Sequence, residues 1–197
     1  ANLFVEDKRE LFVSQADVKD CFYQCSFPRE IGEYFCFDAL TKLELLEFGI
    51  SHVDESWVEF GEDIYPFMRV VPMGWSWAFW LIQEMHIHIL HMSGIKADQI
   101  MVDGRPAPSC SEEKIIVLPY CDNCNVIGTN AETVLQCRFQ ICKKFEECGV
   151  QMHEETDALS DINILGYQKL SGNRLVPSST KVSKIIAALK WIVDGND

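Results

Sequence analysis

The sequence lacks an apolar run long enough to cross a bilayer. Its longest uninterrupted apolar stretch, residues 77–82, is about six residues long, whereas a membrane-spanning helix needs about 20. The N-terminal residues also lack the basic segment and following apolar stretch of a secretory signal peptide. We therefore expect an intracellular protein, cytoplasmic or nuclear, that is neither secreted nor bound to a membrane. Because the first residue is Ala1 rather than Met, we also expect an excised piece of a longer chain.

Basic residues are scarce. The chain has 17 Lys and Arg against 30 Asp and Glu, which gives a net charge of −13. A domain that grips a phosphate backbone by itself is normally basic, so this composition argues against a self-sufficient nucleic-acid-binding protein. An acidic chain can still belong to a nucleic-acid enzyme if it supplies metal-binding carboxylates while other domains bind the phosphate backbone.

The nine cysteines show no regular spacing. An odd, irregular set argues against a disulfide framework and predicts buried thiols in a reducing compartment. Cys121 and Cys124 form a C-x-x-C pair, and His86, His88 and His91 lie upstream. A structural zinc site needs a second ligand pair at a matched distance, which the sequence does not show. A zinc or thiol-redox protein therefore stays a separate hypothesis.

The length of 197 residues and the hydrophobic content of 48% fit a single folded unit with a sizeable core. Apolar periodicity predicts helices at about 76–92, at 131–148 capped by Thr129 or Asn130, and from Ser178 or Ser179 onward. Strands are expected at 10–17, 31–37, 64–71 and 162–170, with the second paired to the first. This order predicts an α+β fold, a mixed sheet with helices packed on one face.

The stretch 114–128 predicts a β-hairpin, because two apolar runs flank a polar tip that contains Asp122. Pro119 lies inside its first strand, so that position must be at an edge, at a bulge or distorted. A second acid, Asp17, ends the strand at 10–17. If the two strands are neighbours, both carboxylates emerge together and can hold the paired cations of a phosphoryl displacement. The alternative is that Asp122 serves only the turn geometry.

Four segments, in this order, resemble the sequence motifs of reverse transcriptases. They are Ala-Asp-Val-Lys-Asp-Cys-Phe-Tyr at 16–23, Val-Pro-Met-Gly-Trp at 71–75, Tyr-Cys-Asp-Asn at 120–123 and Ile-Leu-Gly-Tyr at 164–167. Each motif alone is weak, but the resemblance covers most of residues 10–190. The chain thus resembles the palm region of a reverse transcriptase of the retrotransposon or retrovirus-related type.

The resemblance implies a polymerase palm, an α+β fold with a mixed or antiparallel sheet, in one fragment over 1–197. Within it, 10–170 would be palm with a partial fingers insertion at 38–95, and 171–197 would run from palm to thumb. The implied enzyme is an RNA-directed DNA polymerase that uses two metals to transfer nucleotides onto a primer, within a retroelement polyprotein. Its cofactor would be Mg²⁺, with Mn²⁺ as an alternative. Its partners would be an RNA or DNA primer-template, deoxynucleoside triphosphates and other polyprotein domains, but no membrane.

The resemblance also assigns roles to individual positions. The catalytic residues that hold the metals would be Asp17 and Asp122, joined by the Val18 carbonyl and by Asn123. The nucleotide-binding positions would be Asp20, Cys21, Phe22, Met73 and Gly74. The primer-side positions would be Tyr120, Leu165, Gly166 and Tyr167. Phe22 would exclude a ribose 2′-hydroxyl, although it can equally be a core aromatic. Gly74 would let the backbone approach the base pair, or it can simply interrupt regular structure before a helix.

Two departures from the reverse-transcriptase pattern stand out. Asn123 replaces the second acid of the hairpin motif, which removes one negative charge beside the metals. His153 begins a stretch where these enzymes often have a lysine that protonates the leaving pyrophosphate. His153 can be a general acid or an ordinary strand-edge residue. These departures, with the acidic composition, support an alternative: a degenerate, weak or inactive palm kept as a scaffold or interaction module.

Overall fold

The computed structural model describes residues 4–5, 9–53, 56–57, 61–111 and 114–194. The chain divides into two compact units. The first consists of Ala1–Lys19 and Gln83–Asp197, and the second consists of Asp20–Ile82. Helix α4 (Ala78–Met92) begins in the second unit and continues into the first.

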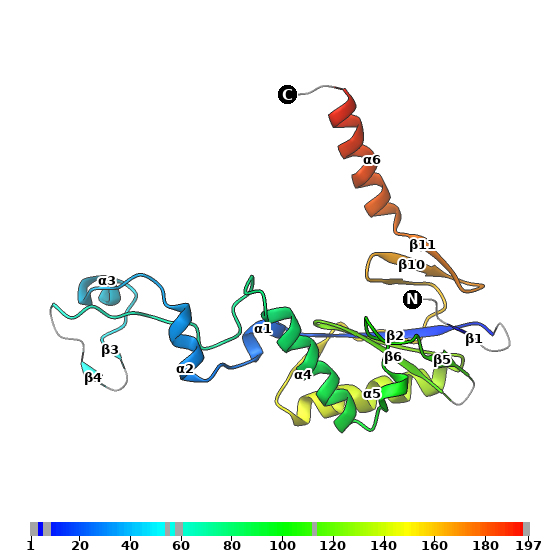
Figure 1. The fold of residues 1–197 in the computed structure, drawn as a ribbon, viewed down its shortest axis with the longest axis horizontal. Coiled ribbons are helices and arrows are strands. Elements are labelled where there is room, and N and C mark those ends of the chain that lie inside the picture. The colour runs from blue at the N-terminus through cyan, green and yellow to red at the C-terminus, as the bar shows by residue number, and fades with distance from the viewer. Residues whose placement is uncertain (1–3, 6–8, 54–55, 58–60, 112–113, 195–197) are drawn as a thin grey trace. The chain divides into compact units, whose positions relative to one another are not determined.

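A four-stranded antiparallel sheet forms the centre of the first unit, in the order β6-β7-β2-β8 (Figure 1). Its strands are β2 (Phe12–Val18), β6 (Ile116–Tyr120), β7 (Asn123–Gly128) and β8 (Met152–His153). The sequence therefore predicted the first strand and the hairpin correctly. Pro119 lies in β6, the edge strand of this sheet, where its missing N–H is tolerated, as expected.

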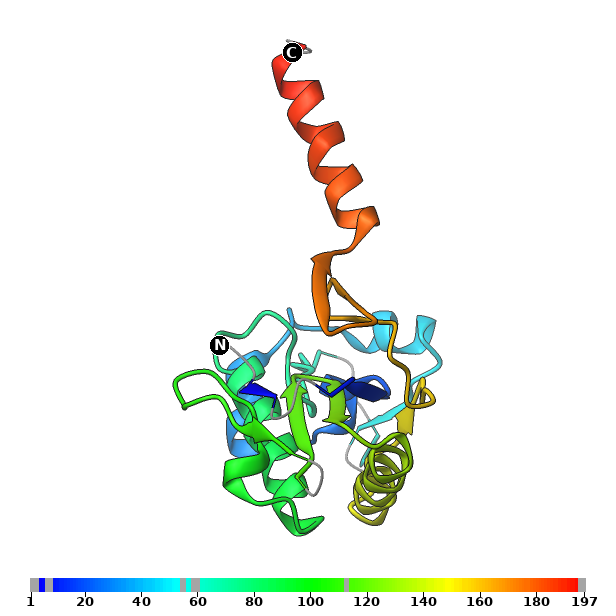
Figure 2. The same cartoon turned by 90° about the vertical axis from the view of Figure 1, so that its right-hand side faces the viewer.

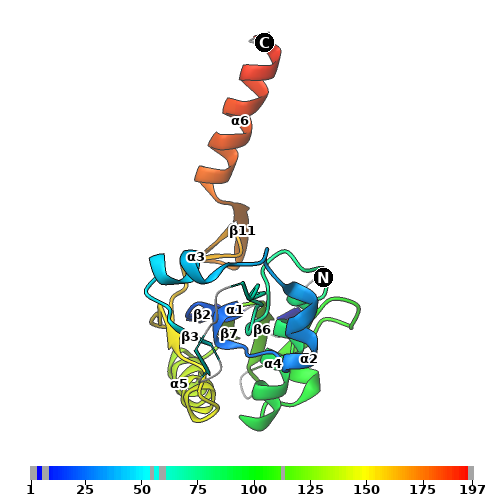
Figure 3. The same ribbon diagram turned by 90° about the vertical axis from the view of Figure 1, so that its left-hand side faces the viewer.

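Helices α4 and α5 (Ala131–Glu147) lie below strands β2, β6 and β7 (Figure 3). Asn130 caps α5, because its Oδ1 accepts a hydrogen bond of 3.0 Å from the Thr133 N–H. The helix then buries one apolar stripe at 3.6-residue spacing, formed by Val134, Cys137, Ile141, Cys142 and Phe145. The rings of His86 and Phe145 join the two helices, with their centroids 5.0 Å apart.

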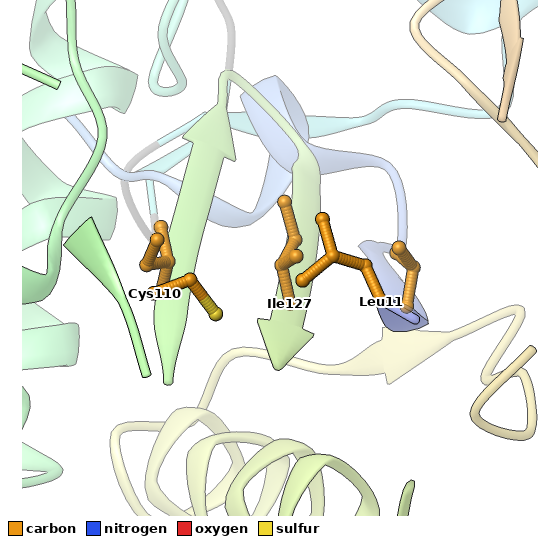
Figure 4. Close-up of a cluster of buried hydrophobic side chains, with 5 residues drawn as sticks. Leu11, Cys110 and Ile127 are labelled. Atoms are coloured by element: carbon orange, nitrogen blue, oxygen red, sulfur yellow. The ribbon is translucent and has the colours of Figure 1, made fainter. Parts of the chain in front are cut away.

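Short elements at the N-terminus and before the hairpin enlarge this core. Strand β1 (Phe4–Val5) pairs in parallel with β5 (Ser109–Cys110), and a 3-10 helix, η3, spans Ala97–Gln99. A buried cluster joins β5 to the main sheet, formed by Leu11, Val13, Cys110, Ile116 and Ile127 (Figure 4). Burial of these side chains is the main source of stability at this end of the sheet.

A second, three-stranded antiparallel sheet contains β9 (Ile162–Ile164), β10 (Tyr167–Leu170) and β11 (Arg174–Pro177). Helix α6 (Ser179–Val193) follows it, capped by the Ser178 hydroxyl, and every described residue of this helix is exposed. Figure 2 shows α5 below the main sheet and α6 extending on the opposite side.

Partly buried ionic and polar contacts connect this second sheet to the start of β2. The Lys169 Nζ, in a residue only 5% exposed, donates to Glu10 Oε1 at 2.5 Å and to the Ser160 carbonyl at 2.8 Å. The Glu10 carboxylate also accepts from the Gly172 N–H. Asn173 adds a hydrogen bond from the Leu11 N–H to its side-chain oxygen.

The second unit is built from short elements. They are α1 (Cys21–Gln24), α2 (Arg29–Gly32), the 3-10 helix η2 (Glu33–Phe35), α3 (Lys42–Glu47), β3 (His52–Val53) and β4 (Ser56–Trp57). Thr41 and Glu44 form a capping box at the start of α3. Three aromatic rings, those of Phe27, Phe35 and Trp75, pack together with centroids 5.3–5.9 Å apart.

Two expected strands are wrong. Residues 31–35 lie in α2 and η2 instead, and Cys36 makes only an isolated bridge to Phe67. The fixed φ of Pro28, just before α2, suits the start of a helical turn. Residues 64–71 make only isolated bridges, at Ile64, Phe67 and Val70. Prolines at 66 and 72 lack the N–H groups that a continuous ladder needs.

The strand expected at 162–170 is interrupted. Leu165 and Gly166 both have positive φ, 47° and 84°, so the chain turns there between β9 and β10. The predicted fold class, α+β with helices on one face of an antiparallel sheet, is confirmed. Among the described residues, no helix combines the length and apolar character that a membrane span requires.

Candidate active site

The two acids of the sequence prediction lie on neighbouring strands. Asp17 is opposite Asn123 in the β2–β7 register, and the Val18 N–H donates to the Asp122 carbonyl at 2.9 Å. Because β2 ends where β7 begins, Asp17 and Asp122 meet at the same end of the sheet. Burial raises the pKa of the Asp17 carboxyl, and the negative charge of Asp122 raises it further.

Among the described residues, a side chain hydrogen-bonds each carboxylate. The His153 Nε2 lies 3.1 Å from Asp17 Oδ2, and β8 places His153 directly opposite Asp17. The Asn123 Nδ2 donates to Asp122 Oδ1 at 2.8 Å. Both partners lower the local electrostatic cost of two neighbouring carboxylates, and each engages a single oxygen. Sequence reasoning did not predict the pairing of His153 with Asp17.

Side chains of α4 hydrogen-bond the backbone of the turn that carries Asp122. The Gln83 Nε2 donates to the Pro119 carbonyl at 3.1 Å, and the Gln83 Oε1 accepts from the Cys121 N–H at 2.9 Å. The His86 Nδ1 lies 2.9 Å from the Cys121 carbonyl. Burial lowers the pKa of His86 to about 4, so its imidazole is neutral at pH 7 and donates through Nδ1–H.

Sequence reasoning missed these supporting roles of Gln83 and His86. Gln83 lies downstream of the motif at 71–75, and His86 was visible only as a member of a histidine cluster. The signal that could have found them is their i, i+3 spacing. It places two polar side chains on one face of a helix that is otherwise largely apolar.

The primer-side positions lie in two places in the first unit. Tyr120 ends β6 and is 50% exposed. Leu165 and Gly166 form the β9–β10 turn, and Tyr167 begins β10 with 49% exposure. The Lys181 side chain lies against the α-carbon of Gly166, so a side chain at 166 would collide with it. The end of an exposed lysine side chain can move away, so it is the positive φ that explains the glycine.

The expected nucleotide-binding positions belong to the second unit. Asp20 adopts a left-handed conformation with φ 46° just before α1, Cys21 is buried and Phe22 is half-buried. Met73 is 63% exposed, and Gly74 has φ 92° with open space where a Cβ would lie. The backbone conformation therefore favours a glycine at this position.

The donor set at the sheet end is suited to a hard cation. In the described parts of the chain, no three or more His, Cys, Asp or Glu side chains are grouped as a metal site. Magnesium does not require three such side chains, because it is often held by one or two carboxylates, with waters and substrate phosphates as its other ligands. Asp17 and Asp122 fit that requirement. Cys124 does not suit zinc here, because complete burial raises the pKa of its thiol and keeps it protonated.

No protein-family model and no curated protein sequence matches this chain. Solved structures do match. A foamy viral protease-reverse transcriptase in complex with double-stranded DNA superposes with a TM-score of 0.59, at 12% identity over 94% of this chain and 25% of that one. The same kind of protein in complex with an RNA/DNA hybrid gives 0.57, at 11% identity over 89% of this chain and 18% of that one.

The chain has a reverse-transcriptase-like fold. It spans a quarter or less of the length of these structural neighbours. The sequence resemblance is thus confirmed at the level of the fold, whereas the roles of the individual site residues stay predictions.

Proposed function

We propose that this chain is the palm of an RNA-directed DNA polymerase of retroelement type. It would transfer nucleotides from deoxynucleoside triphosphates onto a primer, assisted by divalent cations. The observation that carries this proposal is the meeting of Asp17 and Asp122 on adjacent strands of a reverse-transcriptase-like fold. The solved neighbours were captured with DNA and with an RNA/DNA hybrid, which supports a primer-template as the nucleic-acid partner.

Asp17 and Asp122 would hold Mg²⁺ or Mn²⁺, with the Val18 carbonyl and the Asn123 amide as further oxygen donors. Bound there, the cations would stabilise the attacking and leaving oxygens of the phosphoryl transfer. Burial raises the pKa of Asp17, and the negative charge of Asp122 raises it further. A bound cation would relieve the repulsion between the two carboxylates. His153 and Asn123 each engage one oxygen of their carboxylate and leave the other for the cation.

The residues of the second unit would bind the incoming nucleotide. Asp20, Cys21 and Phe22 would line the triphosphate and sugar, and Met73 with Gly74 would approach the base pair. Tyr120 and the Leu165–Tyr167 turn would contact the primer. Because the chain is acidic, we propose that other domains of a polyprotein provide most of the phosphate contacts.

Primer extension on an RNA template tests this proposal in a longer protein that contains this chain. We expect Asp17→Asn and Asp122→Asn each to reduce extension by at least about 100-fold, since each removes a negative charge from the cations. Asp103→Asn, which neutralises an exposed acid in a turn, serves as the matched control and should retain activity. Unchanged extension by both site variants would refute the proposal.

A degenerate palm is the second candidate, because Asn123 stands in place of a second acid and donates a hydrogen bond to the Asp122 carboxylate. Titration of the chain with Mn²⁺, followed by electron paramagnetic resonance, separates the two. Binding that Asp17→Asn abolishes supports the polymerase, and no binding supports a scaffold or interaction module.

A further inference from the structure

Two side chains of α4 contact the backbone that leads into Asp122. Gln83 and His86 are one helical turn apart, and together they make three hydrogen bonds to Pro119 and Cys121. Both backbone groups of Cys121 are therefore engaged by one helix. Cys121 needs this support, because its φ of 55° is a left-handed conformation that side chains disfavour.

His86 is not explained by packing alone. The residue is completely buried, with its ring edge-on to Phe145 of α5. As a neutral donor through Nδ1, it leaves Nε2 with no hydrogen-bonding partner among the described residues. A leucine would fill the same space without an unsatisfied nitrogen, so the benefit of the histidine must come from its bond to the Cys121 carbonyl.

That carbonyl belongs to the peptide bond between Cys121 and Asp122, so a hydrogen bond to it also acts on the backbone of Asp122. A peptide unit is planar, so holding the Cys121 oxygen also orients the Asp122 nitrogen and α-carbon. The next carbonyl, that of Asp122, is held by the Val18 N–H of β2. The Asp122 backbone is thus fixed on one side by α4 and on the other by the strand that carries Asp17.

We propose that His86, together with Gln83, is a positioning residue that aims the Asp122 carboxylate at a divalent cation through the Cys121 peptide bond. This inference rests on the proposed function and deepens it. Partners that orient a metal ligand without touching the metal typically change its affinity 10- to 100-fold when they are removed. Among the described residues, the hydrogen bond of the neutral His86 ring goes to the Cys121 carbonyl, so its effect on the Asp122 position passes through the backbone.

The test compares His86→Leu with His86→Asn in the same chain, using Mn²⁺ affinity and the carboxylate ¹³C resonance of Asp122. Leucine keeps the packing but removes the donor, and asparagine places an N–H near the position of Nδ1. We expect His86→Leu to weaken Mn²⁺ binding about 10- to 100-fold and to shift the Asp122 resonance. We expect His86→Asn to stay within about threefold of the unsubstituted chain, with the resonance unmoved.

Leu90→Ala is the control for lost packing, because Leu90 is a fully buried residue of the same helix. It should lower the thermal midpoint while leaving Mn²⁺ affinity within about twofold. Equal affinities for the two His86 variants would overturn the inference, provided that Asp122→Asn abolishes binding. If the unsubstituted chain binds no Mn²⁺, the proposed function fails instead. The resonance still decides the positioning role, because an Asp122 signal that is identical in His86→Leu and in the unsubstituted chain refutes it.

Discussion

The hydrogen bond from Asn123 to Asp122 makes Asn123→Asp the most informative single substitution in this chain. It replaces a donor with a second acid beside Asp122, and so restores the pattern from which the hairpin departs. Without a cation the change should destabilise the protein. With a cation the new carboxylate should strengthen binding.

The size of the effect follows from the contacts. A hydrogen bond to a charged group contributes about 1.5–3 kcal/mol, and the half-buried positions of Asn123 and Asp122 favour the lower value. The new repulsion lies between about 1 kcal/mol in water and about 4 kcal/mol at an effective dielectric constant of 20, for charges about 4 Å apart. Partial exposure favours about 1–2 kcal/mol, so the total loss should be about 2.5–3.5 kcal/mol.

Asn123→Ala separates the two causes, because it removes the donor without adding charge. We expect it to lose about 1.5 kcal/mol at neutral pH. Urea unfolding in EDTA should therefore rank the unsubstituted chain above Asn123→Ala and Asn123→Asp lowest. Saturating Mg²⁺ should then stabilise Asn123→Asp more than the unsubstituted chain, by about 1.4 kcal/mol for each tenfold gain in affinity.

The reasoning is refuted if Asn123→Asp and Asn123→Ala are equally stable in EDTA and gain equally from Mg²⁺. The same substitution should also change the relative activities in Mg²⁺ and Mn²⁺ when primer extension is measured in a longer protein. Identical metal profiles would count against a role for position 123 beside the cations.

Two further predictions concern the frame around the site. Gly128→Ala should lower the free energy of unfolding in urea by about 1–3 kcal/mol, because its Cβ would lie 2.8 Å from the Cγ2 of the buried Val134. This loss should be smaller when Gly128→Ala is combined with Val134→Ala, and additive losses for the two substitutions would contradict the clash. Hydrogen bonds from Lys169 and then from the Gly172 N–H lower the pKa of Glu10 in the folded state, so Glu10 stabilises the protein above its ordinary pKa and the benefit disappears as the pH falls. The thermal midpoint of Glu10→Gln should therefore lie below that of the unsubstituted chain at about pH 6, and the difference should shrink as the pH falls below the ordinary pKa of glutamate. A difference that stays constant with pH would contradict the linkage.

The sequence contained enough to predict the central site, because local signals and chain order agree there. Asp17 ends an alternating strand, Asp122 lies at a polar hairpin tip, and both occur in the order of a known polymerase fold. Helix α5 was also predictable, since its apolar stripe and its Asn130 cap are encoded locally.

The strand expected at 31–37 was wrong because it rested on the aromatic residues of that segment. Tyr34, Phe35 and Phe37 suggested a strand, but Phe35 packs against Phe27 and Trp75 from a 3-10 turn. That choice depends on tertiary contacts, which override local β propensity. Gln83 and His86 were missed for a related reason: their i, i+3 spacing marks one face of the helix, but it does not show that this face meets the backbone of a distant hairpin.

Pro119 also bears on how this molecule avoids aggregation. An exposed edge strand is a template on which strands of other molecules can add, and this leads to open-ended fibres. At Pro119 the edge strand β6 has no N–H to offer, and the carbonyl is already occupied by Gln83. A foreign strand aligned along β6 would lose its hydrogen bonds two residues before the turn that carries Asp122. On the β6 side, sheet extension between molecules is thereby hindered beside the turn that carries Asp122.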